Sequence, residues 1–196
     1  MVTFRQCMVP DCRRSALTGL DVCATHCSDI RAYEKRIAEI LTSEKRLADY
    51  DISGISLSGL EVEGVSISGS NLQGVRFSGL ILKASSIQLV FWDQAELRNC
   101  NWDGSNVVNT VFAGSLFEGC SLQDCDLLQC NFMGARCKDT AFDHSNLYAG
   151  RFLRATFQNV TMRDCNLMRV RFDTQVTGVD FHASNTNEAT FLEAGR

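Results

Sequence analysis

The chain has 196 residues, of which 45% are apolar and 21% are charged. This composition is ordinary for a soluble globular protein, and the length suits one domain plus a small appendage. The net charge of -4 is too small to indicate, by charge alone, binding to nucleic acid, membranes or polycations. The opening residues, MVTFRQCMVP, are not apolar enough for a signal peptide, and no run of about eighteen apolar residues occurs, so we expect a cytoplasmic protein.

Residues 1–28 contain potential metal ligands with the spacing C-x4-C-x10-C-x2-H. Three thiolates and one imidazole can form a closed tetrahedral zinc site, and so short a segment has no core to fold around without a metal. We therefore expect a structural Zn2+, with free or oxidisable thiols as the alternative and with Cys27 able to replace either of the last two ligands. The expected ligands are Cys7, Cys12, Cys23 and His26.

This segment resembles the small zinc knuckles, written C-x2-P-x-C…C-x2-H, that flank some nuclease domains. Its first half reads CMVPDC, but no nuclease residues follow it. An alternative role is a nucleic-acid contact in which Arg13 and Arg14 bind phosphates. Two arginines are too few to support such binding, so we do not expect direct contact with nucleic acid. A gel shift with duplex DNA that shows no salt-sensitive binding would exclude this role.

Residues 29–49 are predicted to form an amphipathic helix. Apolar side chains recur there at roughly helical spacing on one face, and charged side chains occupy the other face. Such a helix needs an apolar surface to cover, which is either the end of the region that follows or a partner protein. The apolar positions are Ile30, Tyr33, Ile37, Ile40, Leu41 and Leu47.

From Ile52 to Phe172, every fifth residue is apolar. At this composition a series of that length has a chance probability on the order of 10⁻⁹, before allowing for the choice of register. Neither a helix nor a flat strand has a period of five. Many residues of this apolar series have a small residue two positions before them, as Leu122 has Cys120. Several have a glycine two positions after them, as Ile52 has Gly54, where a chain that turns needs conformational freedom.

These residues resemble the pentapeptide-repeat family, whose motif is commonly written A-(D/N)-L-x-x, and the stretches CDLLQ, SNLYA and CNLMR are close copies of it. The resemblance covers about residues 50 to 191. It implies an all-β fold, a right-handed quadrilateral β-helix of about seven coils with four pentapeptides in each coil. The predicted organisation is a Cys/His segment (1–28), a capping α-helix over the open end of the first coil (29–49) and the β-helix itself (50–196).

In such a coil, residues about 20 apart stack, and the resulting columns are chemically uniform here. One column is aromatic and consists of Trp92, Phe112, Phe132, Phe152 and Phe172. An outward column is predicted to form a hydrogen-bonded ladder and consists of Asn106, Asp126, Asn146 and Asn166. Trp92 and Trp102 fall on opposite faces of one coil, which should widen the coil or swing one ring outward. The register slips by one residue after Phe172, so the last coil should be irregular.

The sequence contains no evident catalytic constellation. Most remaining cysteines occupy the small inward position and are interpreted as buried and reduced, although Cys100 and Cys120 would stack within disulfide range. His144 beside Asp143 and His182 beside Asp180 are exposed repeat positions without a thiol or hydroxyl in evident reach. We therefore expect neither an enzyme nor a small-molecule substrate.

The outer surface offers a candidate interface. Several apolar side chains are predicted to form one stripe along the coils, with arginines at its C-terminal end. The predicted apolar positions form two columns, with Leu89, Val108, Leu128, Tyr148 and Met168 in one corner column and Phe91, Val111, Met133 and Leu153 just around the corner. The predicted arginines are Arg151, Arg154, Arg169 and Arg171. The simplest partner for this stripe is a second copy of the chain.

Two functions remain open from the sequence. The first is a non-enzymatic protein-interaction scaffold, which binds a partner protein or forms a homodimer. The alternative comes from the resemblance, because some pentapeptide-repeat proteins modulate DNA gyrase by mimicking duplex DNA and protect it from quinolones. Such a rod should carry roughly one negative charge per 1.7 Å. Residues 136–172 instead contain seven basic and three acidic residues, so the acidic character is confined to the first half of the coil.

Overall fold

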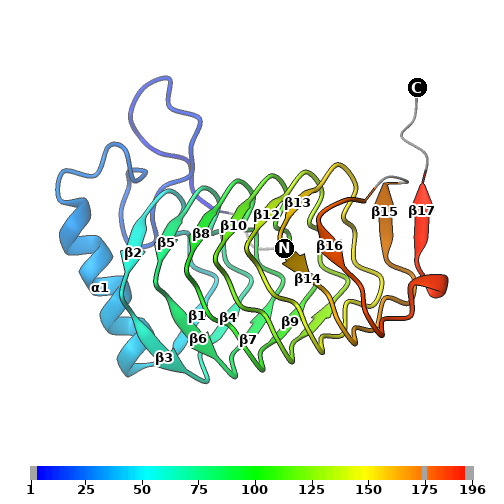
Figure 1. The fold of residues 1–196 in the computed structure, drawn as a ribbon. Coiled ribbons are helices and arrows are strands. Elements are labelled where there is room, and N and C mark those ends of the chain that lie inside the picture. Colours follow the sequence, from blue (N-terminus) through cyan, green and yellow to red (C-terminus); the bar gives the residue numbers. More distant parts are fainter. Residues whose placement is uncertain (1–3, 174–175, 193–196) are drawn as a thin grey trace.

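The computed structural model describes residues 4–173 and 176–192, which form a rod of stacked coils with one helix at its N-terminal end (Figure 1). Short parallel strands from successive coils pair along the rod, with partners 20 residues apart. The expected four-sided β-helix of about seven coils is thus confirmed. Within the described residues, no helix combines the length and the apolar character needed to span a membrane.

We number the four faces of the coil in chain order. Face 1 is the five-stranded sheet of β1 (Arg46–Ala48), β4 (Ser66–Ser68), β7 (Ser86–Gln88), β9 (Asn106–Val108) and β11 (Asp126–Leu128). Face 2 is held mainly by isolated bridges, such as Phe91 with Val111, and ends in β15 (Arg171–Asp173) and β17 (Thr190–Leu192). β1 already pairs with β4, so the coil begins before residue 50.

Faces 3 and 4 complete each turn. Face 3 is the six-stranded sheet of β2 (Ser56–Ser58), β5 (Arg76–Ser78), β8 (Glu96–Arg98), β10 (Leu116–Glu118), β12 (Arg136–Lys138) and β13 (Thr156–Gln158). Face 4 contains β3 (Glu61–Glu63), β6 (Ile81–Lys83), β14 (Val160–Thr161) and β16 (Val179–Asp180). A 3-10 turn, η1 (Thr186–Glu188), precedes β17.

The chain turns because every fifth residue from Asp49 to Arg169 has a positive φ. Glycine occupies many of these corners at no steric cost, for example Gly54 and Gly104. Other corners hold Asn or Asp, which tolerate the left-handed region, but Leu89 at φ 55° belongs to the side chains that adopt it reluctantly. The corners therefore explain the recurring glycines. Residues such as Gln94 and Arg154 share the conformation of Leu89, but Leu89 is the one large apolar side chain among the described corner residues.

The interior is a continuous stack of apolar side chains. The aromatic column of face 2 is confirmed, since the rings of Phe132 and Phe152 lie parallel with centroids 4.6 Å apart. Both indoles of the crowded coil stay inside, with Trp92 and Trp102 stacked at 4.5 Å. The expectation that one ring might swing outward is therefore wrong, because stacking accommodates both. Both indole Nε1 donors remain without a hydrogen-bond partner among the described residues.

Two finer expectations about the coil are also confirmed. The outward ladder of face 1 is hydrogen-bonded from Asp126 to Asn166, because the Asn146 amide donates to Asp126 and the Asn166 amide donates to Asn146. The register slip appears as the pairing of Phe172 with Phe191, whose spacing is 191 minus 172, or 19 residues. The last coil is therefore one residue shorter than the others.

Helix α1 (Ile30–Ser43) covers the open end of the first coil and contacts β1, β2 and β3. The Asp29 side chain caps it by accepting a hydrogen bond from the Ala32 amide. Tyr33, Ile37 and Leu41 face the coil and are buried. The Glu34 carboxylate accepts a hydrogen bond from the Ser56 amide at 2.7 Å, which satisfies one backbone donor at the strand edge. The helix is thus the N-terminal cap of the coil.

Residues 4–28, here called the N-terminal module, lie against the beginning of face 2. The Thr18 amide donates to the Asp51 carbonyl, and the Thr18 hydroxyl accepts from the Asp51 amide. The Ser15 hydroxyl accepts a hydrogen bond from the Asn71 amide group. At Gly54 the module approaches so closely that a Cβ atom would lie 3.4 Å from that of Ala24. The module therefore covers part of the coil surface in addition to carrying its cysteines.

Candidate functional site

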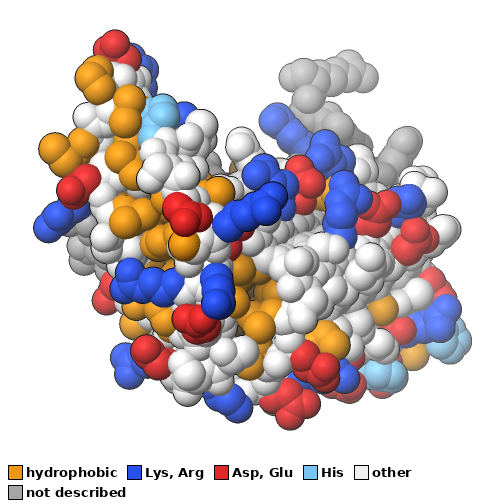
Figure 2. Space-filling view, turned by 90° about the vertical axis from the view of Figure 1, so that its left-hand side faces the viewer, with side chains coloured by type: hydrophobic (Ala, Val, Ile, Leu, Met, Phe, Trp, Pro, Cys, Tyr) orange, Lys and Arg blue, Asp and Glu red, His pale blue; other side chains and the backbone are white. Residues whose placement is uncertain are grey.

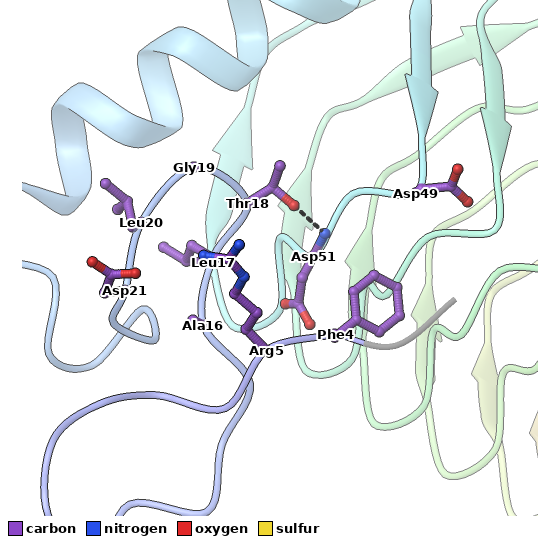
Figure 3. Close-up of a pocket in the computed structure, with 10 residues that line it drawn as sticks. All are labelled: Phe4, Arg5, Ala16, Leu17, Thr18, Gly19, Leu20, Asp21, Asp49 and Asp51. Carbon is purple, nitrogen blue, oxygen red and sulfur yellow. Dashed lines mark hydrogen bonds between the residues drawn. The ribbon is translucent and has the colours of Figure 1, made fainter. Parts of the chain in front are cut away.

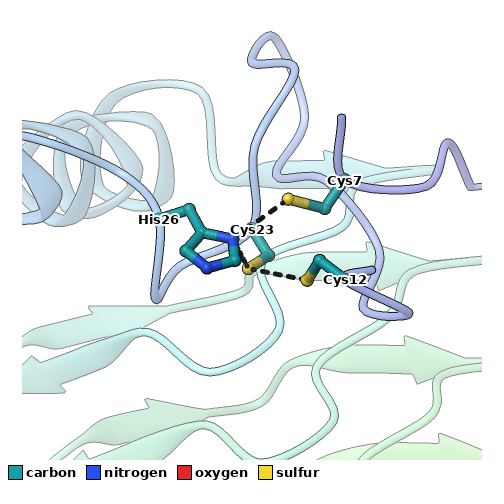
Figure 4. A group of neighbouring side chains, drawn as sticks. All are labelled: Cys7, Cys12, Cys23 and His26. Atoms are coloured by element: carbon teal, nitrogen blue, oxygen red, sulfur yellow. Dashed lines mark hydrogen bonds between the residues drawn. The ribbon is translucent and has the colours of Figure 1, made fainter. Parts of the chain in front are cut away.

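The ligand atoms of Cys7, Cys12, Cys23 and His26 all lie within 4.8 Å of one another (Figure 4). The Sγ atoms of Cys12 and Cys23 are 3.9 Å apart, and His26 Nδ1 lies 3.4 Å from Cys7 Sγ and 3.6 Å from Cys23 Sγ. Tetrahedral zinc with its usual bond lengths separates two sulfurs by about 3.8 Å and a sulfur from a nitrogen by about 3.6 Å. Three of the ligand pairs are therefore spaced as in a tetrahedral zinc site, and the remaining pairs lie within 4.8 Å.

Two local elements bring these ligands together. Gln6 and Ser15 form an antiparallel bridge, and the hairpin between them carries Cys7 and Cys12. The second element is a turn after Cys23, whose carbonyl accepts hydrogen bonds from the amides of His26 and Cys27. Cys27 does not belong to the ligand group and packs against the main core of the coil instead. The alternative in which Cys27 replaces a ligand is thus not the arrangement that this fold adopts.

The electrostatic surroundings favour deprotonated sulfur. Hydrogen bonds from the backbone and side chain of Arg14 hold the pKa of the Cys12 thiol below its usual value. Burial by itself raises the pKa of Cys7, but hydrogen bonds from the backbone of Val9 and Cys23 lower it overall. Thiolate is the form that binds metal. The donor set and its spacing therefore suit a divalent metal ion.

Five of the six coil cysteines have the opposite environment, whereas a hydrogen bond with Cys120 holds the pKa of the Cys100 thiol below its usual value. Cys130 is completely buried, and its Sγ lies 3.3 Å from the Val107 carbonyl oxygen of the preceding coil. Burial raises the pKa of the Cys130 thiol to about 12, and it does the same for Cys137. These side chains act as small apolar residues with a weak hydrogen-bond donor.

A hollow of 380 Å³ lies where the N-terminal module meets the coil (Figure 3). The side chains of Phe4, Arg5, Asp49 and Asp51 line it, together with the loop from Ala16 to Asp21. Asp51 is almost fully buried, and its carboxylate accepts hydrogen bonds from Ser53 and Asn71. Because these bonds use both carboxylate oxygens, Asp51 serves the junction between module and coil.

The predicted apolar stripe lies around the corner between faces 1 and 2. Val108, Leu128, Tyr148 and Met168 follow the outer edge of face 1, and Phe91 and Val111 start face 2 across that corner. Leu89, Phe91 and Met168 are 61%, 50% and 42% exposed. We call the surface formed by these seven residues and the neighbouring arginines the corner surface.

The structure corrects two placements in that stripe. Leu89 does not share a column with Val108, because Gln88 pairs with Val108 and Leu89 occupies the corner itself. Met133 and Leu153 lie on the far side of face 2, beyond the buried Phe132 and Phe152, rather than beside Phe91. Both errors arise because a one-residue shift in a pentapeptide moves a side chain to another edge of the coil.

The four predicted arginines all have exposed side chains, but they do not form one group. Arg151 and Arg171 pair along face 2, and Arg169 occupies the corner, where its guanidinium donates to the Tyr148 hydroxyl at 2.8 Å and lies 5.7 Å from the centre of the tyrosine ring. Arg154 sits at the other edge of face 2, and its amide donates to Asp173. Three of the arginines therefore adjoin the corner surface.

The sequence analysis did not predict that Leu89 adopts a backbone conformation that is unfavourable for leucine. The signal was present, since Leu89 falls two positions after Ile87, where glycine recurs in other repeats. The contact between the module and face 2 had no comparable signal in the sequence. The His144 and Asp164 side chains form an exposed pair at 3.3 Å that no thiol or hydroxyl joins among the described residues.

Comparison with known proteins gives the following results. Residues 112–148 match the family model of pentapeptide repeats, described as eight copies. A comparison with curated protein sequences found no significant match.

Solved structures with similarity include a trypsin-treated form of QnrB1, a plasmid-mediated fluoroquinolone resistance protein. It is 17% identical, and the alignment covers 71% of this chain and 90% of that one with a TM-score of 0.40. Rfr23, a pentapeptide repeat protein from the cyanobacterium Cyanothece 51142, is 13% identical, with coverage of 80% and 98% and a TM-score of 0.28.

A pentapeptide repeat protein from the Arabidopsis thaliana thylakoid lumen is 17% identical, with coverage of 57% and 61% and a TM-score of 0.27. At these identities and scores the solved structures carry no functional argument. The match over residues 112–148, the five-residue period and the corner at every fifth residue show that this chain contains pentapeptide repeats folded as a β-helix.

Proposed function

We propose that this chain is a non-enzymatic protein-interaction scaffold whose corner surface binds a second copy of the chain. The observation that carries the proposal is Leu89, which is 61% exposed and lies at a corner with φ 55°. Leucine is unfavourable there for two reasons, because the left-handed conformation strains it and because its side chain remains in water. A residue that contributes so little to the fold is best explained by contact with another molecule.

The surroundings of Leu89 support the same conclusion. Phe91 lies beside it and is half exposed. Met168 presents a further exposed apolar side chain along the rod, with polar Asn109 and Gln129 at the corners between them. Arg169 and Tyr148 contact each other at the C-terminal end, and both residue types are enriched at protein interfaces. Contiguous apolar surface with such anchors commonly marks a binding site.

In this proposal the metal centre is a structural Zn2+ site. All four coordination positions would be filled by Cys7, Cys12, Cys23 and His26, which leaves none for a substrate. Zinc would hold the hairpin and the turn of the module together and thereby keep the module on face 2. Cys7 and Cys23 are buried, in keeping with a structural site.

The gyrase-directed alternative requires a continuous run of negative charge. On face 3, however, Glu118 forms ion pairs with Arg98 and with Lys138, so positive and negative side chains alternate along the rod. This pattern favours a surface that contacts ordinary protein over one that imitates duplex DNA.

Light scattering on the purified protein at high concentration tests the proposal. We expect the wild type to be a dimer and the variants Leu89→Asn, Leu128→Glu and Tyr148→Glu to be monomers with unchanged circular dichroism. Asn suits the left-handed corner, so Leu89→Asn removes the apolar side chain without straining the fold.

Leu116→Glu is the matched control, because Leu116 is a partly exposed leucine on face 3, away from the corner surface. It should leave the dimer unchanged. A wild type that stays monomeric at high concentration, or a dimer that survives all three variants, would contradict self-association through this surface.

A further inference from the structure

A second hollow separates the N-terminal module from the edge of faces 2 and 3. It has a volume of 590 Å³, which is within the usual range of roughly 300 to 1,000 Å³ for small-molecule sites. Figure 2 shows the module as a projection beside this hollowed region, with Lys and Arg side chains gathered next to it. We call this hollow the arginine groove.

The charge of the arginine groove differs from that of the chain. Arg13 and Arg14 enter it from the module and Arg76 from strand β5, whereas the described residues that line it include no carboxylate. The chain as a whole has a net charge of -4, and residues 50–126 contain nine acidic but only three basic residues. Three guanidinium groups around one hollow therefore concentrate positive charge where the surrounding sequence is acidic.

The three arginines have different surroundings. Arg14 Nη1 donates to the Thr25 hydroxyl at 2.6 Å, which ties Arg14 to the turn that follows Cys23. Arg13 is exposed, and Arg76 is exposed with its Nε within 3.3 Å of the Ser56 hydroxyl. Arg13 and Arg76 therefore present donors from two separate structural elements, one on each side of the groove.

We propose that the arginine groove binds a small ligand that carries phosphate groups. A planar guanidinium can donate two parallel hydrogen bonds to a phosphate, and such charge-assisted bonds are roughly twice as strong as neutral ones. Gln73, Gln94 and Ser53 also line the groove and can supply neutral hydrogen bonds. The acidic surroundings beyond the groove disfavour a long nucleic acid, because its further phosphates would be repelled.

Glu96 provides a sharper test of this assignment. It pairs with Arg76 in register on face 3 and lines the neighbouring hollow on the other side of that arginine, where its carboxylate also lies 3.8 Å from the Arg98 guanidinium. A phosphate in the arginine groove would compete with this carboxylate for Arg76. Neutralising Glu96 should therefore strengthen phosphate binding, whereas loss of either exposed arginine should weaken it.

Isothermal titration of the metal-loaded full chain with inorganic pyrophosphate at low salt tests the proposal. We expect one site, weakened about tenfold or more by Arg13→Ala and by Arg76→Ala, and strengthened severalfold by Glu96→Gln. Arg136→Ala is the control, because Arg136 is an exposed arginine on face 3 outside the groove, and it should bind as the wild type does. Thermal melting and metal content, measured before and after titration, verify that each variant is folded and loaded.

The absence of binding by the wild type, or unchanged binding by both Arg13→Ala and Arg76→Ala, would overturn the proposal. The same titration with a single-stranded oligonucleotide tests whether the phosphate groups belong to a nucleic acid instead of a small ligand. If the oligonucleotide binds more tightly than pyrophosphate and loses affinity in the same arginine variants, the groove is a nucleic-acid contact and the small-ligand proposal is wrong.

Discussion

In the coil, almost every interior side chain has an equivalent above and below it, as Phe132 has in Phe112 and Phe152. In the N-terminal module, the separate small core consists of Cys7, Cys12 and Cys23 with Val9 and Val22 packed against them. The coil therefore folds by repeating one contact many times, whereas the module depends on a few contacts that occur once. Loss of one contact should consequently have different effects in the two regions.

The contrast extends to what each region needs from its surroundings. Each turn of the coil packs against the turns above and below it. The free energy of unfolding is therefore approximately a sum of contributions from single turns and from the contacts between neighbouring turns. The module has too little apolar area to fold alone, and a metal ion can supply the missing free energy.

The largest effect is expected from removal of a metal ligand. Cys12→Ser should abolish tight metal binding and release the fold of residues 4–28, because metal binding contributes about 10 kcal/mol or more in small zinc modules. The coil should remain folded, since the cysteine cluster is separate from its core, but Leu17 of the module is buried in that core and should become exposed. Metal analysis combined with hydrogen exchange resolved along the chain measures both effects.

Cys27→Ser is the matched control, because Cys27 is adjacent to His26 in sequence but packs against the coil instead of joining the cluster. This variant should keep its metal. Loss of metal from Cys27→Ser, or cooperative unfolding of the whole coil in Cys12→Ser, would contradict the separation of the two regions.

The fold of the coil could be predicted because the same sequence pattern recurs in every turn. A period of five in the apolar residues defines the turns, and the uniform columns define the coil length independently, as the ring stack through Phe132 shows. The errors arose where one residue decides the outcome. The register of Leu89 and the packing of Trp92 against Trp102 depend on local geometry that the period does not describe.

The module was predictable only in its ligands. The spacing of Cys7, Cys12, Cys23 and His26 indicated a four-ligand site, since short gaps place ligands on one hairpin or turn. Its position on face 2 depends on single contacts such as that of Thr18 with Asp51, which leave no pattern in the sequence. The arginine groove was missed for the same reason, because Arg76 meets Arg13 only through this docking.

An intermediate effect is expected from a cavity inside the coil. Phe132→Ala removes a fully buried ring from the aromatic stack and should lower the free energy of unfolding by about 3–5 kcal/mol. Metal affinity should not change, because Phe132 lies far along the coil from the module. Urea unfolding followed by circular dichroism measures the stability, and metal analysis serves as the control. A loss of metal in parallel with stability would show that the two regions fold as one unit.

The smallest effect concerns Asp93, a half-buried carboxyl on face 2. Burial raises the pKa of Asp93 above its usual value, so the ionised form is less favourable in the folded chain than in the unfolded one. The resulting loss of stability is present at neutral pH and disappears as the pH falls through the raised pKa. Asp93→Asn should therefore stabilise the protein at pH 7 by a few tenths of a kcal/mol, after allowance for solvent screening.

The sign of this pH dependence is the decisive measurement for Asp93→Asn. Thermal or urea unfolding of wild type and variant should give a difference at pH 7 that shrinks towards zero under acidic conditions, where the wild-type carboxyl is protonated. Asparagine can still accept the hydrogen bond that the Asp93 side chain receives from its own backbone, so this contact is not lost. A variant that is less stable at pH 7, or a difference independent of pH, would mean that Asp93 is stabilised by its neighbours rather than penalised by burial. Asp93 would then join Glu118 as a carboxyl of the coil that is held by specific charged partners.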